Sequence, residues 1–475
     1  MDSNQQSWPY FDPEYETLSA RINPPRVVVD NASCENATLI KVDSVNTHGV
    51  LLEVVQVLTD LNLCISKAYI SSDGGWFMDV FHVTDQNNKK LTDSTIIEHI
   101  EQSLCATSAQ QDIRRRAELR STLGRGKTVG VKSVAERNYT AIELTGTDRP
   151  GLLSEISAVL TELGCNVKHA EVWTHNLRVA CVVYVTDEKT GGTVEDPEVQ
   201  ARIRRRLAVV MNGGDDEKGS KTEFGTLLTP PERRLHQMMF EDRDFDEECK
   251  LEAPKIEDRA DDGRPLITVQ NCNEKGYSIV NVESIDRPKL LFDTVCTLTD
   301  MQYVVFHATI NAEDGFAHQE YYIRHLDGRF LDTEVERIKV IKCLEAAIER
   351  RVSDGLRLEL CTSDRVGLLS EVTKMFRENG LSVTRADVVT RDKQAVNVFY
   401  VTDAAGKPVD RRVVDSMQSK MGKTILHVTE VPRLSRSPPN EPAKGSKGFS
   451  LGTLIKQQSE KFIYSLGSLG WARSI

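Results

Sequence analysis

The stretch DRPGLLSEISAVLTELGCN, residues 148–166, decides how the chain folds locally. Its apolar residues recur three and four positions apart, which is the spacing of one face of an α-helix. The preceding residues, TAIELTGT, are strand-like, and Gly164 follows the last apolar position, where glycine tolerates the left-handed conformation that ends many helices. We therefore predict a strand, a loop and a helix, and the buried face of the helix consists of Leu152, Leu153, Ile156, Val159, Leu160 and Leu163.

The same pattern occurs four times in the chain. The other loops and helices read NTHGVLLEVVQVLTDLNLC from Asn46, DRPKLLFDTVCTLTDMQYV from Asp286 and DRVGLLSEVTKMFRENGLS from Asp364. A later strand aligns without gaps in every copy, as WFMDVFHVTD from Trp76, RVACVVYVTD from Arg178, FAHQEYYIRH from Phe316 and QAVNVFYVTD from Gln394. Such a period indicates an array of four similar structural units.

Each repeat continues with a hairpin of β-branched strands and a second helix, such as DPEVQARIRRRLAVV from Asp196. A β-α-β-β-α-β order, with both helices on one face of an antiparallel sheet, is the ferredoxin-like fold of the α+β class. The last strand is clear only in the fourth copy, as TILHVTEV from Thr424. Between the third and fourth loops there is too little chain for two separate strands, so one strand is either shared or lost.

These patterns divide the chain into four modules and four other segments. Because each module is tethered to its neighbour, we expect two tandem pairs, module 1 with 2 and module 3 with 4, joined by an acidic and flexible linker. Within that linker ERRLHQMMFEDRDF could instead be a docking helix, and the tail either caps a domain or binds a partner. The expected boundaries are 1–36 (N-terminal segment), 37–110 (module 1), 111–137 (basic connector), 138–212 (module 2), 213–265 (acidic linker), 266–352 (module 3), 353–432 (module 4) and 433–475 (C-terminal tail).

Composition excludes several classes of protein. The 475 residues are 39% hydrophobic and 28% charged, with a formal net charge of -11, which disfavours non-specific binding to nucleic acid or to anionic membranes. No run is long and apolar enough to cross a bilayer, and the N-terminus does not resemble a secretory signal. The ten cysteines are scattered without a C-x-x-C pair, which predicts reduced thiols in the cytoplasm or the nucleus.

The sequences D-R-P-G-L-L-S-E from Asp148 and D-R-V-G-L-L-S-E from Asp364, with strands ending in V-T-D, resemble the ACT domain. Four copies without another domain resemble the plant ACT domain repeat (ACR) proteins, over about Ala37 to Val431. The resemblance implies a sensor that needs no cofactor and binds a free amino acid, glutamine or another small one, between two paired modules. It also implies an unidentified target protein, and it leaves a homo-oligomer open.

The loop itself suits an amino acid. A helix N-terminus offers unpaired N–H groups and a positive dipole end to a carboxylate, and Gly151 and Gly367 let a ligand approach the backbone. Asp148 and Asp364 either cap the helix, which we favour, or meet the ligand's ammonium group. Lys289 replaces the glycine in the third loop, which we therefore predict to be structural. The candidate amino-acid-binding residues are Asp148, Arg149, Gly151, Leu152, Asp364, Arg365, Gly367, Leu368, Asn46 and Gly49.

An enzyme is the main competing class, and the residues that it needs are missing. The sequence has no His-Asp dipeptide, no H-E-x-x-H and no cysteine–histidine cluster with zinc spacing. The Gly-Lys-Thr runs at Gly126 and Gly422 lack the earlier glycine of a phosphate loop. We predict no catalytic or metal-binding residue. The alternative function is a scaffold or regulatory subunit that pairs with a protein through exposed sheet edges and binds no metabolite.

Overall fold

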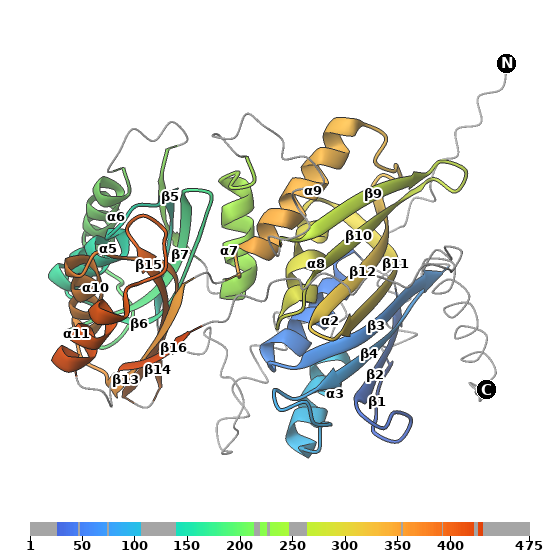
Figure 1. The fold of residues 1–475 in the computed structure, drawn as a ribbon, viewed down its shortest axis with the longest axis horizontal. Helices are drawn as coiled ribbons and strands as arrows, with labels where there is room; N and C mark the ends of the chain where they lie inside the picture. Colours follow the sequence, from blue (N-terminus) through green and yellow to red (C-terminus); the bar gives the residue numbers. More distant parts are fainter. Residues whose placement is uncertain are drawn as a thin grey trace, which may run out of the picture. The chain divides into compact units, whose positions relative to one another are not determined.

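A computed structural model describes residues 26–45, 48–73, 76–105, 139–212, 219–225, 229–246, 264–352, 355–391, 393–421 and 426–430. The described elements form two antiparallel sheets of eight strands, with helices packed on them (Figure 1). The predicted α+β class and its ferredoxin-like modules are confirmed. The basic connector and the C-terminal tail lie outside the described residues.

Modules 2 and 4 have the predicted β-α-β-β-α-β order. The fourth strand of module 2 is β8, which pairs with β5 and lies beyond the expected boundary at residue 212. The elements of module 2 are β5 (Thr140–Thr147), α5 (Leu152–Glu162), β6 (Cys165–His175), β7 (Arg178–Asp187), α6 (Pro197–Met211) and β8 (Lys221–Gly225). Those of module 4 are β13 (Leu356–Ser363), α10 (Leu368–Glu378), β14 (Leu381–Arg391), β15 (Gln394–Asp403), α11 (Arg411–Met421) and β16 (Leu426–Glu430).

Modules 1 and 3 build the same sheet from a different chain order, β-β-α-β-β-α. Their outer strands, β1 and β9, come first in the chain order and pair with β2 and β10, so that neither module shares or loses a strand. Module 1 therefore begins within the expected N-terminal segment. Its elements are β1 (Arg26–Asp30), β2 (Thr38–Val45), α2 (Val50–Asp60), β3 (Cys64–Asp73), β4 (Trp76–Thr84) and α3 (Ser94–Cys105). Those of module 3 are β9 (Leu266–Cys272), β10 (Tyr277–Ile285), α8 (Leu290–Asp300), β11 (Tyr303–Glu313), β12 (Phe316–His325) and α9 (Glu334–Glu349).

The modules pair alternately, and the expected tandem pairing is wrong. One sheet has the order β1-β2-β4-β3-β11-β12-β10-β9 and joins modules 1 and 3, while the other, β16-β13-β15-β14-β6-β7-β5-β8, joins modules 4 and 2. Equivalent strands meet at each junction, with Tyr69 opposite Thr309 and Glu171 opposite Asp387. Tethering does not select the partner, because the entropic cost of closing a loop rises only slowly with its length. The choice of partner therefore depends on which sheet edges and helix faces are complementary.

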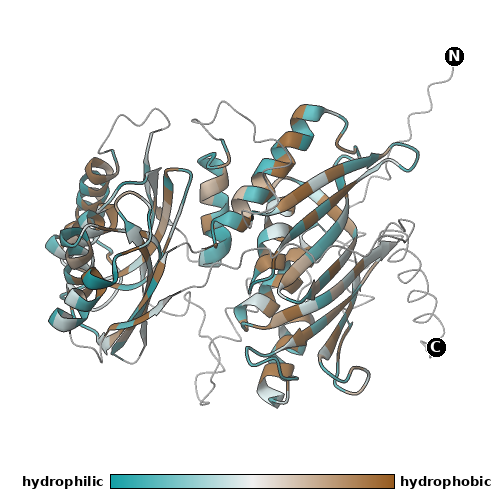
Figure 2. Ribbon diagram, in the orientation of Figure 1, coloured by the Kyte–Doolittle hydropathy of each residue, from teal (hydrophilic) through white to brown (hydrophobic). Residues whose placement is uncertain are grey.

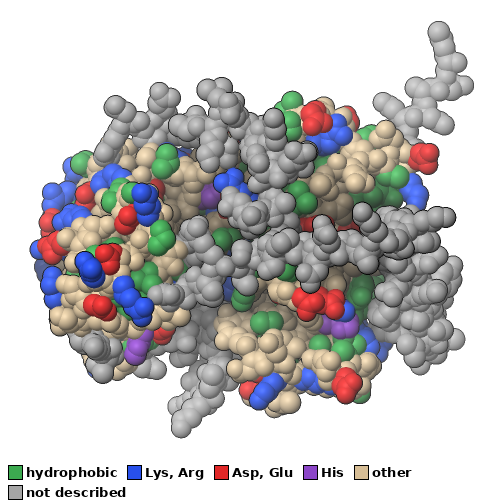
Figure 3. Space-filling view, in the orientation of Figure 1, with side chains coloured by type: hydrophobic (Ala, Val, Ile, Leu, Met, Phe, Trp, Pro, Cys, Tyr) green, Lys and Arg blue, Asp and Glu red, His purple; other side chains and the backbone are tan. Residues whose placement is uncertain are grey.

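Each pair of modules shares one hydrophobic core beneath its helices. The core of modules 2 and 4 contains Leu152, Ile156, Leu368 and Phe376 from the helices that meet across the junction. Hydrophobic and hydrophilic residues alternate along the strands (Figure 2), since successive side chains point to opposite faces of a sheet. Charges of both signs are interspersed on the visible surface (Figure 3). Within the described residues, no helix has the length and hydrophobicity required to cross a membrane.

The segment expected as a flexible linker contains the ordered helix α7 (Pro231–Glu241). This helix covers the open face of module 2, where Leu235, Met238 and Met239 pack against Trp173 and other buried residues of β5, β6 and β7. The docking helix that the sequence left as the alternative is therefore correct, and the flexible linker is wrong over residues 229–246. The packing of these two methionines and one leucine explains why a segment rich in charged residues is bound to module 2.

Candidate functional site

Each of the four loops that open a first helix is turned by a residue with positive φ. These residues are Gly49 (φ 89°), Gly151 (84°), Lys289 (69°) and Gly367 (79°). The preceding aspartate fixes the loop to the tip of the following hairpin, because the Asp148 amide donates to Leu177 O at 2.7 Å and the Asp364 amide to Lys393 O at 2.8 Å. The repeated sequence thus gives a repeated backbone cradle.

The helix caps differ from the favoured interpretation of the aspartates. Gly151 and Gly367 are the N-cap residues, and neither helix has a side-chain cap hydrogen bond. Capping by Asp148 and Asp364 is therefore wrong. Burial raises the pKa of the Asp148 carboxyl to about 6, while a backbone hydrogen bond and the charge of Arg149 act in the opposite direction. The Asp148 side chain thus does not cap the helix and instead lines a pocket beside the loop.

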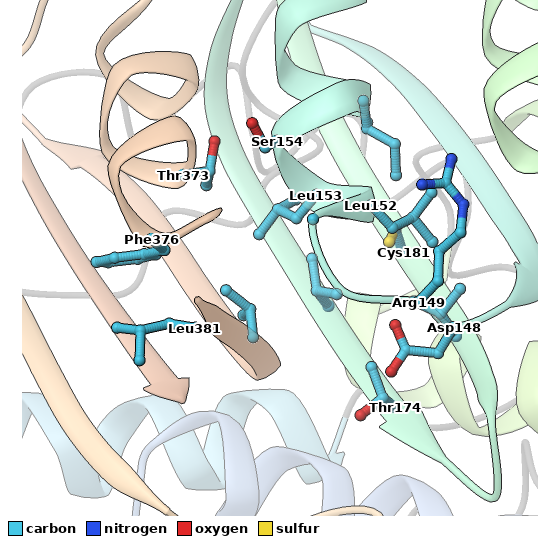
Figure 4. Close-up of a pocket in the computed structure, with 15 residues that line it drawn as sticks. Asp148, Arg149, Leu152, Leu153, Ser154, Thr174, Cys181, Thr373, Phe376 and Leu381 are labelled. Atoms are coloured by element: carbon cyan, nitrogen blue, oxygen red, sulfur yellow. The ribbon is translucent and has the colours of Figure 1, made fainter. Parts of the chain in front are cut away.

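The loop of module 2 lines a pocket that module 4 closes, here called the loop-2 pocket. Asp148, Arg149, Gly151 and Leu152, four of the candidate binding residues, all line it. Figure 4 shows Asp148 and Thr174 on one side, with Phe376 and Leu381 of module 4 opposite. About 400 Å³ of empty space lies between these residues, and part of it is open solvent. Its wall is completed by Leu153, Ser154, Ile156, Val172, Val179, Cys181, Thr373 and Val383.

The loop of module 4 lines a second pocket of the same design, the loop-4 pocket. Asp364, Arg365, Gly367 and Leu368 are all part of it, and module 2 closes it with residues from α5 and the start of β6. Its empty space is about 350 Å³, again including an open part. The other lining residues are Ser157, Thr161, Cys165, Asn166, Val167, Leu369, Val388, Thr390, Ala395 and Asn397.

An approximate twofold axis relates the two pockets. It passes between Ser157 and Thr373, equivalent residues of α5 and α10 whose hydroxyl oxygens lie 2.9 Å apart. A Cβ added to Gly151 would lie 2.7 Å from Arg377 Cδ, whereas one added to Gly367 would lie 3.4 Å from Thr161 Cγ2. Each glycine therefore faces the partner's helix, and the aliphatic part of the Arg377 side chain lies against Gly151.

The pockets differ in charge and polarity. In the loop-4 pocket Lys168 Nζ of module 2 lies 2.5 Å from Asp364 Oδ2, but the residue equivalent to Lys168 near Asp148 is Thr384. Buried Cys181 in the loop-2 pocket corresponds to Asn397 in the loop-4 pocket. Asn397 is 2% exposed, and its Oδ1 has no hydrogen-bond partner among the described residues. The loop-2 pocket thus offers a carboxyl group and an apolar wall, and the loop-4 pocket offers a buried acceptor.

The two loop arginines brace the pockets. Arg149 donates to both carboxylate oxygens of Glu155, at 3.0 and 2.5 Å, and to Val210 O at 3.0 Å. Arg365 is bonded to Glu371 in the same way at one oxygen. Because these guanidinium groups are already bound, the structure places them as supports of the helix N-terminus.

The first and third loops are different. In the third, Lys289 pairs with Glu232 of α7, and Glu232 Oε2 also accepts from Arg351 at 2.9 Å. Burial favours the neutral acid, but attraction to Arg351 and Lys289 outweighs it and lowers the pKa of Glu232 to about 2. The third loop is thus filled by side chains. In the first loop Asn46 lies outside the described residues, and a Cβ on Gly49 would meet no atom within 4 Å.

Sequence reasoning missed the pocket walls that the partner module supplies. Thr373 and Phe376 of one helix and Ser157 and Thr161 of the other could have been found from their register, since each pair of repeats aligns without gaps. Nothing in the sequence indicated Lys168 as a site residue, because its contact with Asp364 depends on which modules pair. Among the described residues, no cluster of His, Cys, Asp or Glu has an arrangement that could hold a metal ion.

Ferredoxin-like modules that join by equivalent edge strands, with glycine-turned loops facing the partner's helix, define a protein built from ACT domains. A family model for the ACR family N-terminal ACT domain matches residues 33–111, and an ACT domain model matches residues 140–208 and 356–418. The chain is 56% identical to the ACT domain-containing protein ACR3 of Arabidopsis thaliana over 422 residues, which are 88% of this chain and 90% of that protein. It is 52% identical to ACR4 of the same plant over 450 residues, 94% and 96% of the two chains.

The chain belongs to the ACR family of ACT domain-containing proteins, which are regulatory proteins. A solved structure, a putative glycine cleavage system transcriptional repressor, is 13% identical and covers 44% of this chain and 92% of that chain. Its TM-score is 0.17, too low to support an argument about how the modules are arranged.

Proposed function

We propose that the chain is a non-catalytic amino-acid sensor whose modules 2 and 4 together hold ligand in the loop-2 and loop-4 pockets. The observation that carries the proposal is the crossed arrangement of two glycine-turned helix N-termini, each facing the other module's helix. First-turn amides attract a carboxylate, and Asp148 lies where an ammonium group would follow.

The two pockets should prefer different side chains. The apolar wall of Cys181, Phe376 and Leu381 favours an aliphatic amino acid in the loop-2 pocket. The unpartnered Asn397 Oδ1 favours a ligand with an N–H donor in the loop-4 pocket, because a buried acceptor without a donor is costly. An amide side chain, such as that of glutamine, supplies this donor.

The scaffold alternative rests on exposed sheet edges. Since β3, β6, β11 and β14 are paired inside the chain, it would have to use the outer strands β1, β9, β8 and β16 of the described sheets. We also propose residence in the cytoplasm or the nucleus. This is supported by eight cysteines within the described ranges, which are free thiols.

The test is calorimetric titration of the full chain with the twenty amino acids, repeated with Gly151→Val and Gly367→Val. Each change should abolish binding at its own pocket, so the Gly151 variant reports the loop-4 pocket and the Gly367 variant the loop-2 pocket. Valine at positive φ strains the backbone, so a matched control is needed. Gly191→Val and Gly406→Val provide it, since these glycines have φ of 69° and 75° and open space around a Cβ. Undiminished affinity in the double variant Gly151→Val/Gly367→Val would show that the loops are ordinary turns.

A further inference from the structure

The tip of the hairpin formed by β6 and β7 links the loop-2 pocket with module 3. The tip consists of His175, Asn176 and Leu177, and the last two have positive φ, of 44° and 59°. On the side of module 2, Leu177 O accepts a hydrogen bond from the Asp148 amide at 2.7 Å. On the other side, His175 Nε2 lies 3.2 Å from Glu349 Oε2, at the end of α9 in module 3. A change at the tip can therefore reach both modules.

Both ring nitrogens of His175 face a carboxylate. Nδ1 lies 3.1 Å from Asp244 Oδ2, in the segment that follows α7, and Nε2 faces Glu349. A neutral imidazole has one N–H group and one lone pair, so it can donate to only one of these carboxylates. The protonated ring has two N–H groups and satisfies both. The geometry therefore fits the charged form of His175.

The neighbouring charges favour the same form. Asp244 is fully buried and accepts from Arg350 at both carboxylate oxygens, each at 2.6 Å. The two carboxylates of this group are thus matched by two cations only when His175 is protonated. Loss of the proton leaves one carboxylate without its positive partner, which is costly in a buried cluster. Burial opposes a charged ring, but the hydrogen bonds to Asp244 and Glu349 outweigh it and raise the pKa of His175.

A second histidine of the same cluster has the opposite character. His236 Nδ1 lies 3.0 Å from Arg350 Nη1, and an arginine can only donate. The proton of the His236 ring is therefore on Nε2, which donates to Asp293 Oδ1 at 2.8 Å. Burial lowers the pKa of His236, so this ring stays neutral. Of the two rings, that of His175 is the one placed to gain and lose a proton.

We propose that His175 forms a proton-dependent bridge between module 2 and module 3, closed when its ring is protonated and loosened when the ring is neutral. The name His175 bridge is used below for its two hydrogen bonds, to Asp244 and to Glu349. The neutral ring keeps one of them, and Glu349 is the partner that is released, because its side chain is 34% exposed and is readily hydrated. The bridge is independent of whether the loop-2 pocket binds an amino acid.

The direction of the pH dependence follows from the folded protein's preference for the charged ring. Because the pKa of His175 is raised above its ordinary value of 6.5, the bridge is closed below that pH. It loosens as the pH rises through the raised value. Protons reach the ring from the side of Glu349, the exposed partner.

Other contacts of the tip are the same in both states. Arg178 Nε lies 2.6 Å from Asp242 Oδ2, and Asn176 donates to Asp244 O at 2.7 Å. Neither bond involves the His175 ring. Loosening of the bridge therefore weakens the contact between the tip and the end of α9, while the tip stays bound to the segment that follows α7.

The charge of His175 can be measured directly. NMR of the unliganded full chain with labelled histidine gives a titration curve for each ring, and His175→Gln identifies the signal. We expect His175 to titrate above the ordinary value of 6.5. In Glu349→Gln the curve should move to lower pH, because one carboxylate partner is lost. His318→Gln is the matched control, since the His318 side chain is 54% exposed on β12, and it should leave the curve unchanged.

Hydrogen exchange, corrected for the intrinsic effect of pH, measures the bridge itself. In the parent chain, peptides from residues 174–181 and 344–351 should exchange about tenfold faster at pH 8.5 than at pH 6, the effect of one charge-assisted hydrogen bond. His175→Gln and Glu349→Gln should exchange fast at both pH values. His318→Gln should behave like the parent, and peptides from β15 of module 4 should be the same in every chain.

Two results would overturn the proposal. One is a His175 ring that titrates at or below the ordinary value, and the other is exchange at the tip and at the end of α9 that does not change with pH in the parent. A pH-dependent change that persists in His175→Gln would do so as well, because another group would then be responsible. Glu349→Gln alters a partly exposed side chain and keeps the test decisive if His175→Gln destabilises the fold.

Discussion

Asp148 and Asp364 hold the same position in two repeats but have different surroundings. Lys168 pairs with Asp364, whereas burial raises the pKa of Asp148 to about 6. Two aspartates at equivalent positions of the repeat thus have different electrostatic surroundings. The difference arises in the opposite module, where Lys168 and Thr384 are equivalent.

Ligand affinity at the loop-2 pocket should therefore depend on pH. A ligand ammonium binds the ionised carboxylate, and because the pKa of free Asp148 is raised to about 6, protonation on going from pH 7 to pH 5 competes with binding. Affinity should fall about tenfold over that range. Calorimetry on the Gly367→Val chain isolates this pocket. Asp148→Asn should bind more weakly at pH 7 and lose the dependence, and an unchanged pH slope in that variant would exclude Asp148 as the titrating group.

At the scale of elements, α7 connects the face of module 2 with the third loop. His236 Nε2 lies 2.8 Å from Asp293 Oδ1, and Arg350 donates to Asp244 Oδ2 at 2.6 Å. Arg351 also stacks over Trp173, with its guanidinium carbon 4.6 Å from the ring centre. Such a buried polar cluster is stable only while every member keeps its partner.

The ion pair between Glu232 and Lys289 should show coupling in a double-mutant cycle. Glu232→Ala leaves the Arg351 and Lys289 charges without their shared partner, so it should lower the free energy of unfolding by about 2–3 kcal/mol. Lys289→Ala should cost less, because Arg351 still pairs with Glu232. The double variant should be more stable than the sum of the single changes predicts, by about 1 kcal/mol. Urea unfolding measures all three, and simple additivity would refute this coupling.

The sequence predicted elements better than their partners. The first helices followed from the spacing of apolar residues, and the left-handed end of the second repeat's helix followed from Gly164, which has positive φ. Asn62 and Gly380, at the equivalent positions, have positive φ as well. Gln302, with φ of 66°, closes its helix in the same way although glutamine gives no such signal. The helix α7 was only an alternative, because three charges near its start resemble a solvated linker and its packing surface belongs to another module. The outer strands β1 and β9 were missed because they come before the strand, loop and first helix of their repeats, whereas the predicted order places the outer strand after the second helix.

The whole molecule is held by contacts between segments far apart in the chain. Modules 1 and 3 share one sheet and one core, and so do modules 2 and 4. Pocket residues could be predicted within a module from the repeated loop, but the wall across the junction depends on this pairing. A sequence repeat specifies similar edges without stating which two edges meet, and this is why the tandem arrangement was predicted wrongly.

Alternate pairing predicts that a cut between modules 2 and 3 will not separate the halves. A protease site placed within residues 247–263 should yield two fragments that elute together at the size of the intact chain, because β3–β11, β6–β14 and both cores join them. The fragments should part only in denaturant. Size-exclusion chromatography under native conditions checks this, and elution of two independent folded halves would contradict the alternate arrangement.

The alternate pairing of the modules also determines how long their sheet edges stay unpaired during translation. Module 1 leaves the ribosome when its partner, module 3, has yet to be translated, and about 240 residues separate the ends of α3 and α9. At a translation rate of roughly 5–20 residues per second, the edge of β3 remains unpaired for on the order of tens of seconds until β11 is made. The edge of β6 remains unpaired for a similar time until β14 is made. The nascent chain therefore carries two unpaired edges at once, and a chaperone that shields strands during translation should raise the yield of the native protein.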